Sequence, residues 1–231
     1  MAKHKVFISY HHANDQWAKD KLQEWNDQED MFIDLSVNSD EVDDSLPTER
    51  IREIIRDDYL RDSTVTIVLV GTETWGRKHV DWETYSSMFD GSVNKKSGIL
   101  VVQLPSTNPK HITAAHDIEK KAIYSEYTSW TTISDRTEYD RRYPFLSDRL
   151  KDNLLAPGAK MSVTKWDTIA ANHAHLSTMI DAAFEDRAGR GGRGEDHARR
   201  GARFGCRDVD MLARPCLRIA ALETVEAHDI K

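Results

Sequence analysis

The fold is decided by the stretch Thr64-Val65-Thr66-Ile67-Val68-Leu69-Val70-Gly71. Most of its residues are β-branched, and such residues favour strands. Its second half is apolar throughout, which is typical of a strand that is covered on both faces. The stretch therefore predicts a buried central strand. Shorter apolar runs predict further strands at residues 5–10, 31–35 and 98–104, and another is expected at 161–163.

Helix-like stretches separate these strands. Helices are expected around residues 15–25, 45–59, 81–89 and 166–184, where apolar side chains recur on one helical face. Strands that alternate with helices of this length form parallel sheets with helices on both faces. We therefore predict an α/β fold with a doubly wound parallel sheet of about five strands.

Composition excludes several classes of protein. The chain has 231 residues, of which 39% are hydrophobic and 31% charged, as in soluble globular proteins. Its net charge of -7 makes nucleic acid an unlikely main partner. The apolar runs are too short for a membrane span or a signal-peptide core, so no membrane partner and a cytoplasmic location are expected. Two cysteines exclude a disulfide framework.

A change of composition near Arg187 divides the chain into two parts. Residues 1–187 hold the predicted strands and helices, whereas residues 188–231 are rich in Gly and Arg and contain both cysteines. This tail has no periodicity, and we expect it to be disordered and dispensable. Residues 189–194 match G-x-G-x-x-G, but a dinucleotide-binding motif requires a strand before it, and here a helix precedes it.

Short motifs follow one another at a characteristic spacing: Val6-Phe7-Ile8-Ser9-Tyr10-His11, Phe32-Ile33-Asp34, the central strand, Arg77-Lys78-His79-Val80-Asp81-Trp82-Glu83, and Trp166-Asp167 with Ile180-Asp181 near the end. In this order they resemble a TIR-like domain, and more narrowly the TIR-like proteins of bacterial Thoeris anti-phage systems. The resemblance covers residues 3–187 and is strongest before residue 105.

The resemblance implies a flavodoxin-like sheet and an activity on NAD. Many prokaryotic TIR domains cleave the bond between nicotinamide and ribose, and Thoeris members release cyclic ADP-ribose isomers as a signal. An effector NADase, a separate protein, senses that signal. The resemblance thus implies NAD as substrate rather than a bound cofactor, an indirect effector partner, and possible self-association.

The resemblance also assigns roles to individual residues. Glu83 matches the catalytic glutamate, and one carboxylate is enough to stabilise an oxocarbenium-like ribosyl cation. Substrate-binding roles are expected for residues at or near the strand ends, where ligands of such sheets bind, and for the aromatic residue beside the glutamate: Ser9, Tyr10, His11, Asp34 and Trp82. Related domains commonly carry Trp four residues before the glutamate, and this chain has His79 there.

Other functions are open to the same sequence. The main alternative is a non-catalytic TIR-like module that binds a partner protein through residues 38–44 and the helix that follows. A receiver domain is disfavoured, because Gly71-Thr72 stands where a phosphorylatable Asp would end the central strand. No metal site is expected, because the ten histidines and two cysteines lack ligand spacing.

Overall fold

The computed structural model describes residues 3–36, 60–88, 95–156, 158, 160–188 and 225–227, and the single positions 50, 54 and 57. Apart from those single positions, the predicted loop 38–44 and the helix expected at 45–59 lie outside the described residues. The tail predicted over 188–231 also lies outside them, except for Ala188 and residues 225–227. Its disorder stays a prediction.

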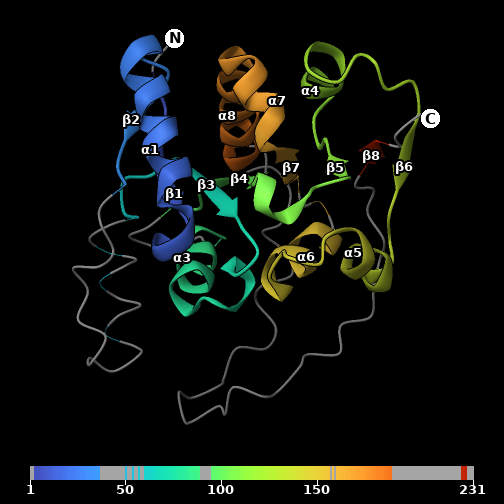
Figure 1. The fold of residues 1–231 in the computed structure, drawn as a ribbon, viewed down its shortest axis with the longest axis horizontal. Coiled ribbons are helices and arrows are strands. Elements are labelled where there is room, and N and C mark those ends of the chain that lie inside the picture. The colour runs from blue at the N-terminus through green and yellow to red at the C-terminus, as the bar shows by residue number, and fades with distance from the viewer. Residues whose placement is uncertain are drawn as a thin grey trace, which may run out of the picture.

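An eight-stranded sheet with the order β2-β1-β3-β4-β7-β5-β8-β6 runs through the described structure (Figure 1). Its first five strands are parallel: β2 (Ile33–Asp34), β1 (Lys5–Ser9), β3 (Val65–Val70), β4 (Gly98–Gln103) and β7 (Ser162–Lys165). This is the flavodoxin-like doubly wound order. The predicted α/β fold with about five parallel strands is therefore confirmed.

Three short strands extend the sheet beyond β7 in the antiparallel direction: β5 (Ile112–Thr113), β8 (Val225–Ala227) and β6 (Trp130–Thr132). The sequence pattern does not predict them, because strands of two or three residues are too short to show alternation. β8 comes from the segment predicted to be a tail, and it pairs with both β5 and β6.

Helices cover both faces of the sheet (Figure 1). One face carries α1 (His12–Glu29), α7 (Trp166–Ala171) and α8 (His173–Ala188), with α4 (Asp117–Ala122) beside α8; the other carries α3 (Lys78–Met88), α5 (Arg136–Arg142) and α6 (Asp148–Leu155). Single-turn helices η3 (Thr74–Gly76) and η4 (Pro105–Thr107) follow β3 and β4. Of the helices described, none is both long and apolar enough to cross a membrane.

Alternating strand residues build two apolar clusters, one on each face of the sheet. On β1, Val6 and Ile8 belong to the cluster under α1 and α8. On β3, Ile67 belongs to the same cluster, whereas Val68 belongs to the cluster under α3 and α6. Ser9, next to Ile8 on β1, consequently faces α3. The alternation therefore decides which strand-end side chains meet the helix that holds Glu83.

The last predicted helix is divided in two. Asn172 has extended backbone angles, φ −157 and ψ 109, and separates α7 from α8. Its side-chain oxygen accepts a hydrogen bond from Ala174 N at 3.1 Å, as at a helix N-cap. The prediction of one continuous helix from residue 166 to 184 is wrong at this residue, because the apolar periodicity runs through Asn172 and conceals the cap.

A partly buried polar network ties α4 to the end of α8. The ring nitrogens of His116 lie 3.1 Å from Glu119 Oε1 and 2.6 Å from Asp186 Oδ2. Ser162 Oγ donates to Glu119 Oε2 at 2.6 Å. Burial opposes charging the imidazole, but the hydrogen bonds and charges of Asp186 and Glu119 outweigh burial and raise the pKa of His116 to about 9.

This network makes the stability of the protein depend on pH. A raised pKa means that the charged imidazole stabilises the folded state fully below its ordinary pKa of 6.5, and that this stabilisation is lost as pH rises through about 9. At ~1.4 kcal/mol per pKa unit it amounts to roughly 3 kcal/mol. The free energy of unfolding, measured with urea at pH 6 and at pH 9.5, should fall by roughly 3 kcal/mol more for the parent than for His116→Gln. Equal losses in both proteins would contradict the charged network.

Candidate active site

Glu83 lies on the face of α3 that packs against the sheet. Its carboxyl group is buried, with 3% of the residue exposed. Ser9 Oγ, at the carboxyl end of β1, donates to Glu83 Oε2 at 2.6 Å. The residue predicted to be catalytic and the first predicted substrate-binding residue are therefore in direct contact at the edge of the sheet where ligands of this fold bind.

Hydrogen bonds on both sides of Glu83 hold α3 in place. One turn later, Ser87 Oγ donates to the carbonyl oxygen of Glu83 at 2.8 Å, and it lies 2.7 Å from Thr66 Oγ1 on β3. In the first turn, Asp81 accepts two hydrogen bonds from Arg149 of α6, both of 2.7 Å. Such bidentate pairs fix orientation as well as distance. The carboxyl group of Glu83 is thus held toward Ser9.

Burial changes the acidity of Glu83. Loss of hydration disfavours the carboxylate, and the hydrogen bond from Ser9 offsets this only in part, so that the pKa of Glu83 rises to about 8. At neutral pH the side chain is consequently a neutral acid in the ligand-free protein. Carboxyl groups with strongly raised pKa values are concentrated at functional sites.

Two buried polar atoms next to this pair lack hydrogen-bond partners among the described residues: Nδ1 of His11 and Oγ1 of Thr84. His11 follows Ser9 by two residues and is 8% exposed, and Thr84 follows Glu83 and is 1% exposed. Buried polar groups are normally paired, and unpaired ones are often explained by a ligand or a functional role. His11 is one of the predicted substrate-binding residues, and Thr84 was not predicted.

A second buried carboxyl group at the same edge was not predicted. Asp15, in the first turn of α1, is 3% exposed, and Thr74 Oγ1 donates to its Oδ2 at 3.1 Å. Burial raises the pKa of Asp15 in spite of that bond. A Cβ at Gly71 would lie 2.5 Å from both Asp15 carboxylate oxygens, so a side chain at position 71 would displace that carboxyl group. In the sequence, the only feature that could have pointed to Asp15 as a site residue is its position shortly after the first predicted strand.

Three other predicted binding residues have contacts elsewhere in the structure. Tyr10 is buried in the cluster under α1, and its hydroxyl group donates to Gln16 Oε1 at 2.7 Å. Asp34, on the edge strand β2, accepts from Ser36 N at 2.7 Å and from Gln23 Nε2 at 2.5 Å. Trp82 is 7% exposed and meets the ring of His79 edge-on. Their substrate-binding roles stay predictions.

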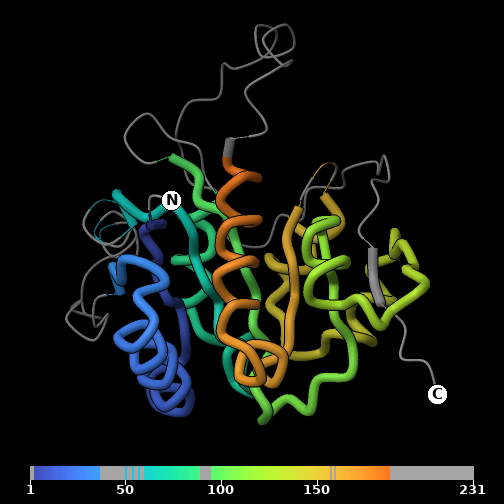
Figure 2. The backbone as a smooth tube through the Cα atoms, turned by 90° about the horizontal axis from the view of Figure 1, so that it is seen from above, coloured from blue at the N-terminus to red at the C-terminus, as the bar shows by residue number. Residues whose placement is uncertain are grey.

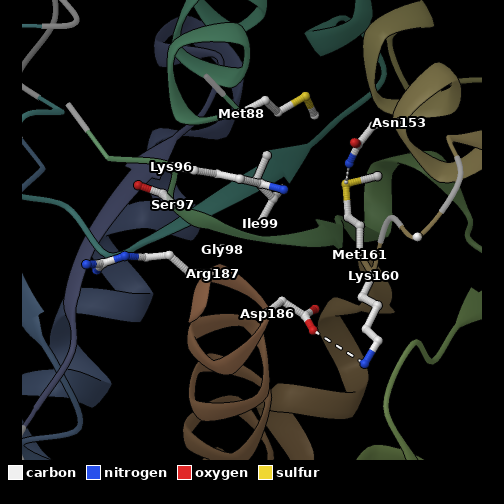
Figure 3. Close-up of a pocket in the computed structure, with 11 residues that line it drawn as sticks. Met88, Lys96, Ser97, Gly98, Ile99, Asn153, Lys160, Met161, Asp186 and Arg187 are labelled. Atoms are coloured by element: carbon white, nitrogen blue, oxygen red, sulfur yellow. Dashed lines mark hydrogen bonds and ion pairs between the residues drawn. The ribbon is translucent and has the colours of Figure 1, made fainter. Parts of the chain in front are cut away.

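Two cavities lined by described residues lie at the amino-terminal edge of the parallel strands, opposite the Glu83–Ser9 pair. One, of about 110 Å³, has Lys96, Lys160 and Arg187 around the start of β4 at Gly98 (Figure 3). The other, of about 460 Å³, lies between the start of β1 and the second half of α8. Neither touches Glu83 or Ser9. Within the described residues, no group of three His, Cys, Asp or Glu could hold a metal ion.

Comparison with protein families finds a match to part of the chain. Residues 7–109 match the family model described as Thoeris protein ThsB, TIR-like domain. The match begins in β1 and ends after η4, so it contains the carboxyl ends of β1, β3 and β4. No curated protein matches the chain. Residues 7–109 are therefore similar to the TIR-like domain of the Thoeris protein ThsB, and the paired Ser9 and Glu83 both lie within that matched segment.

Proposed function

We propose that this protein cleaves the nicotinamide–ribose bond of NAD, with Glu83 as the catalytic carboxyl group. The observation that carries the proposal is the buried 2.6 Å contact between Ser9 Oγ and Glu83 Oε2 at the carboxyl ends of the parallel strands. The family match supports it, because it spans both residues.

The chemistry requires one well-placed carboxylate. The bond between C1′ of the ribose and the ring nitrogen breaks, its electron pair leaves with nicotinamide, and an oxocarbenium-like ADP-ribosyl cation remains. Glu83 stabilises that cation, as a carboxylate does in glycoside hydrolysis. Water then adds and releases one proton, which gives ADP-ribose, or an adenine or ribose atom of the same molecule adds and gives a cyclic isomer.

The raised pKa of Glu83 fits this role. The nicotinamide ring of NAD carries a positive charge, and an opposite charge nearby favours the carboxylate. Binding of NAD therefore ionises Glu83 in a site where little water screens the charge, and the charge is then in place to stabilise the developing cation. When nicotinamide leaves, its positive charge passes to the ribose, and the carboxylate keeps a cation beside it.

The product we propose is a cyclic ADP-ribose-type signal for a separate effector NADase. An intramolecular nucleophile competes with water when the site excludes water, and the described surroundings of Glu83 are buried. The direct test incubates the full chain with NAD and measures nicotinamide, ADP-ribose and cyclic isomers by mass spectrometry. The same nucleotides are measured in infected cells that express the parent or Glu83→Gln. Infected parent cells without any Glu83-dependent product would contradict the proposal.

One observation favours a second function, a non-catalytic module that binds a partner protein. Glu83 is 3% exposed, so a substrate has little direct access to its carboxyl group in the described structure. A module of this kind would form its partner complex equally well with glutamine at position 83. Co-purification from infected cells with and without Glu83→Gln, beside the nucleotide measurement, separates the two functions.

A further inference from the structure

Trp75, on η3, is the most exposed of the large apolar side chains in the described part of the chain, with 61% of the residue exposed. Every other tryptophan of the chain has an aromatic neighbour: Trp17 and Trp25 meet Trp166, Trp82 meets His79, and Trp130 meets Tyr124 and Tyr127. No described ring contacts Trp75. Its indole faces solvent directly after the carboxyl end of β3.

The turn that displays Trp75 is firmly held. Gly71 N donates to Thr74 Oγ1 at 2.8 Å, and Thr74 Oγ1 donates to Asp15 Oδ2 at 3.1 Å. Thr74 is 4% exposed, although it precedes the most exposed tryptophan. The carboxyl group of Asp15 that accepts from Thr74 is itself buried, and it lies against the backbone at Gly71. Because the backbone of this turn is fixed, a flat ligand that stacks on Trp75 does not have to order the turn.

Trp75 and Glu83 lie at the same edge of the sheet at different levels. Ser9, which holds Glu83, pairs with Val68 of β3. The turn that carries Trp75 begins three residues later, at Gly71, which is about 10 Å farther along the strand direction. A dinucleotide with its nicotinamide ribose at Glu83 has a second base to place beyond the Ser9–Glu83 pair.

We propose that Trp75 is the stacking platform for the adenine of NAD, a role that rests on the proposed cleavage of NAD. The large π-face of indole stacks on any base, and the turn holds it outward beyond the Ser9–Glu83 pair. Trp82, the platform expected from the sequence, is 7% exposed and has no comparable free face. Trp75 thus determines the preference for the dinucleotide over a nicotinamide mononucleotide.

Titration calorimetry on the full chain tests this role. The Glu83→Gln background slows turnover enough for binding to be measured. NAD and nicotinamide mononucleotide are the two probes, since both contain the nicotinamide ribose and only NAD contains adenine. Adding Trp75→Ala is expected to weaken NAD binding roughly tenfold or more and to leave mononucleotide binding unchanged. Trp75→Phe should retain most of the affinity for NAD. Ile118→Ala removes a 52% exposed side chain on the remote α4, and it should change neither the affinity for NAD nor that for the mononucleotide.

The outcomes separate this inference from the proposed function. If NAD binds and Trp75→Ala leaves its affinity unchanged, or weakens both ligands equally, the stacking role is wrong while the proposed cleavage stands. If neither ligand binds at millimolar concentration, the proposed function fails, and the stacking role fails with it. If Trp75→Ala instead abolishes capture of a partner protein while NAD binding is unchanged, the indole is part of a protein interface.

Discussion

Replacing Glu83 by glutamine is expected to lower nicotinamide release by about 10³-fold while the protein stays folded, as is typical for loss of one electrostatic contact to a transition state. Glutamine has nearly the same shape, and Ser9 Oγ can donate to its amide oxygen as it donates to Glu83 Oε2. What is lost is the negative charge that stabilises the ribosyl cation in the proposed reaction. The measurement is the single-turnover rate of nicotinamide release by the full chain.

The matched control is Glu24→Gln. Glu24 lies on the exposed side of α1 in a surface ion pair with Lys21, where its side chain is 52% exposed. Surface pairs contribute little, so this variant should release nicotinamide at the parent rate and keep its stability within about 0.5 kcal/mol. Parent-like release by Glu83→Gln in the same assay would show that the carboxyl group is not catalytic.

The acidity of Glu83 adds a pH dependence with a definite sign. Its pKa in the folded protein, about 8, lies above the ordinary 4.5, so the folded state holds the proton more tightly than the unfolded chain. The associated stabilisation is fully present below pH 4.5 and is lost as pH rises through about 8. Glu83→Gln has no such loss and should be increasingly more stable than the parent across this range. For free enzyme, kcat/KM of the parent should rise toward pH 8 as the carboxylate forms.

The sequence predicts the part of this site that is local in the chain. A buried β-branched run leads to the central strand, and the motif that contains Glu83 places it on the next helix. Parallel pairing then brings Ser9 to that helix, because alternation on β1 turns Ser9 away from the cluster that contains Ile8. These steps need only strand periodicity and the crossover rule.

The remaining features depend on contacts between residues that are distant in sequence. Asp15 becomes a buried carboxyl group only because Thr74, 59 residues later, reaches it. Tyr10 and Trp82 are of residue types that often contact ligands, but packing places both side chains in the interior. β8 pairs across more than 90 residues with β5 and β6 and has no pattern of its own. Periodicity describes one segment at a time and carries no information on such partners.

The second large effect is expected from Gly98→Ala, which should destabilise the fold by about 3 kcal/mol or more. Gly98 begins β4, and α8 runs over the middle of the sheet above it (Figure 2). A Cβ at Gly98 would lie 1.9 Å from the carbonyl oxygen of Ala183 and 2.4 Å from its carbonyl carbon. Both atoms belong to the backbone of α8, so no side-chain rotation relieves the clash, and α8 must move away from β4.

Gly76→Ala is the matched control for this substitution. Gly76 is the last residue of η3, and a Cβ there meets no atom within 4 Å. The free energy of unfolding of Gly76→Ala should therefore stay within about 0.5 kcal/mol of that of the parent. Thermal unfolding followed by circular dichroism should place Gly98→Ala roughly 10 °C below both proteins, given 2–4 °C per kcal/mol at this chain length. Because α8 carries Asp186, the same variant should also weaken the link to His116 and flatten the pH dependence between 6.5 and 9. A melting temperature equal to that of Gly76→Ala would mean that α8 does not rest on β4 at Gly98.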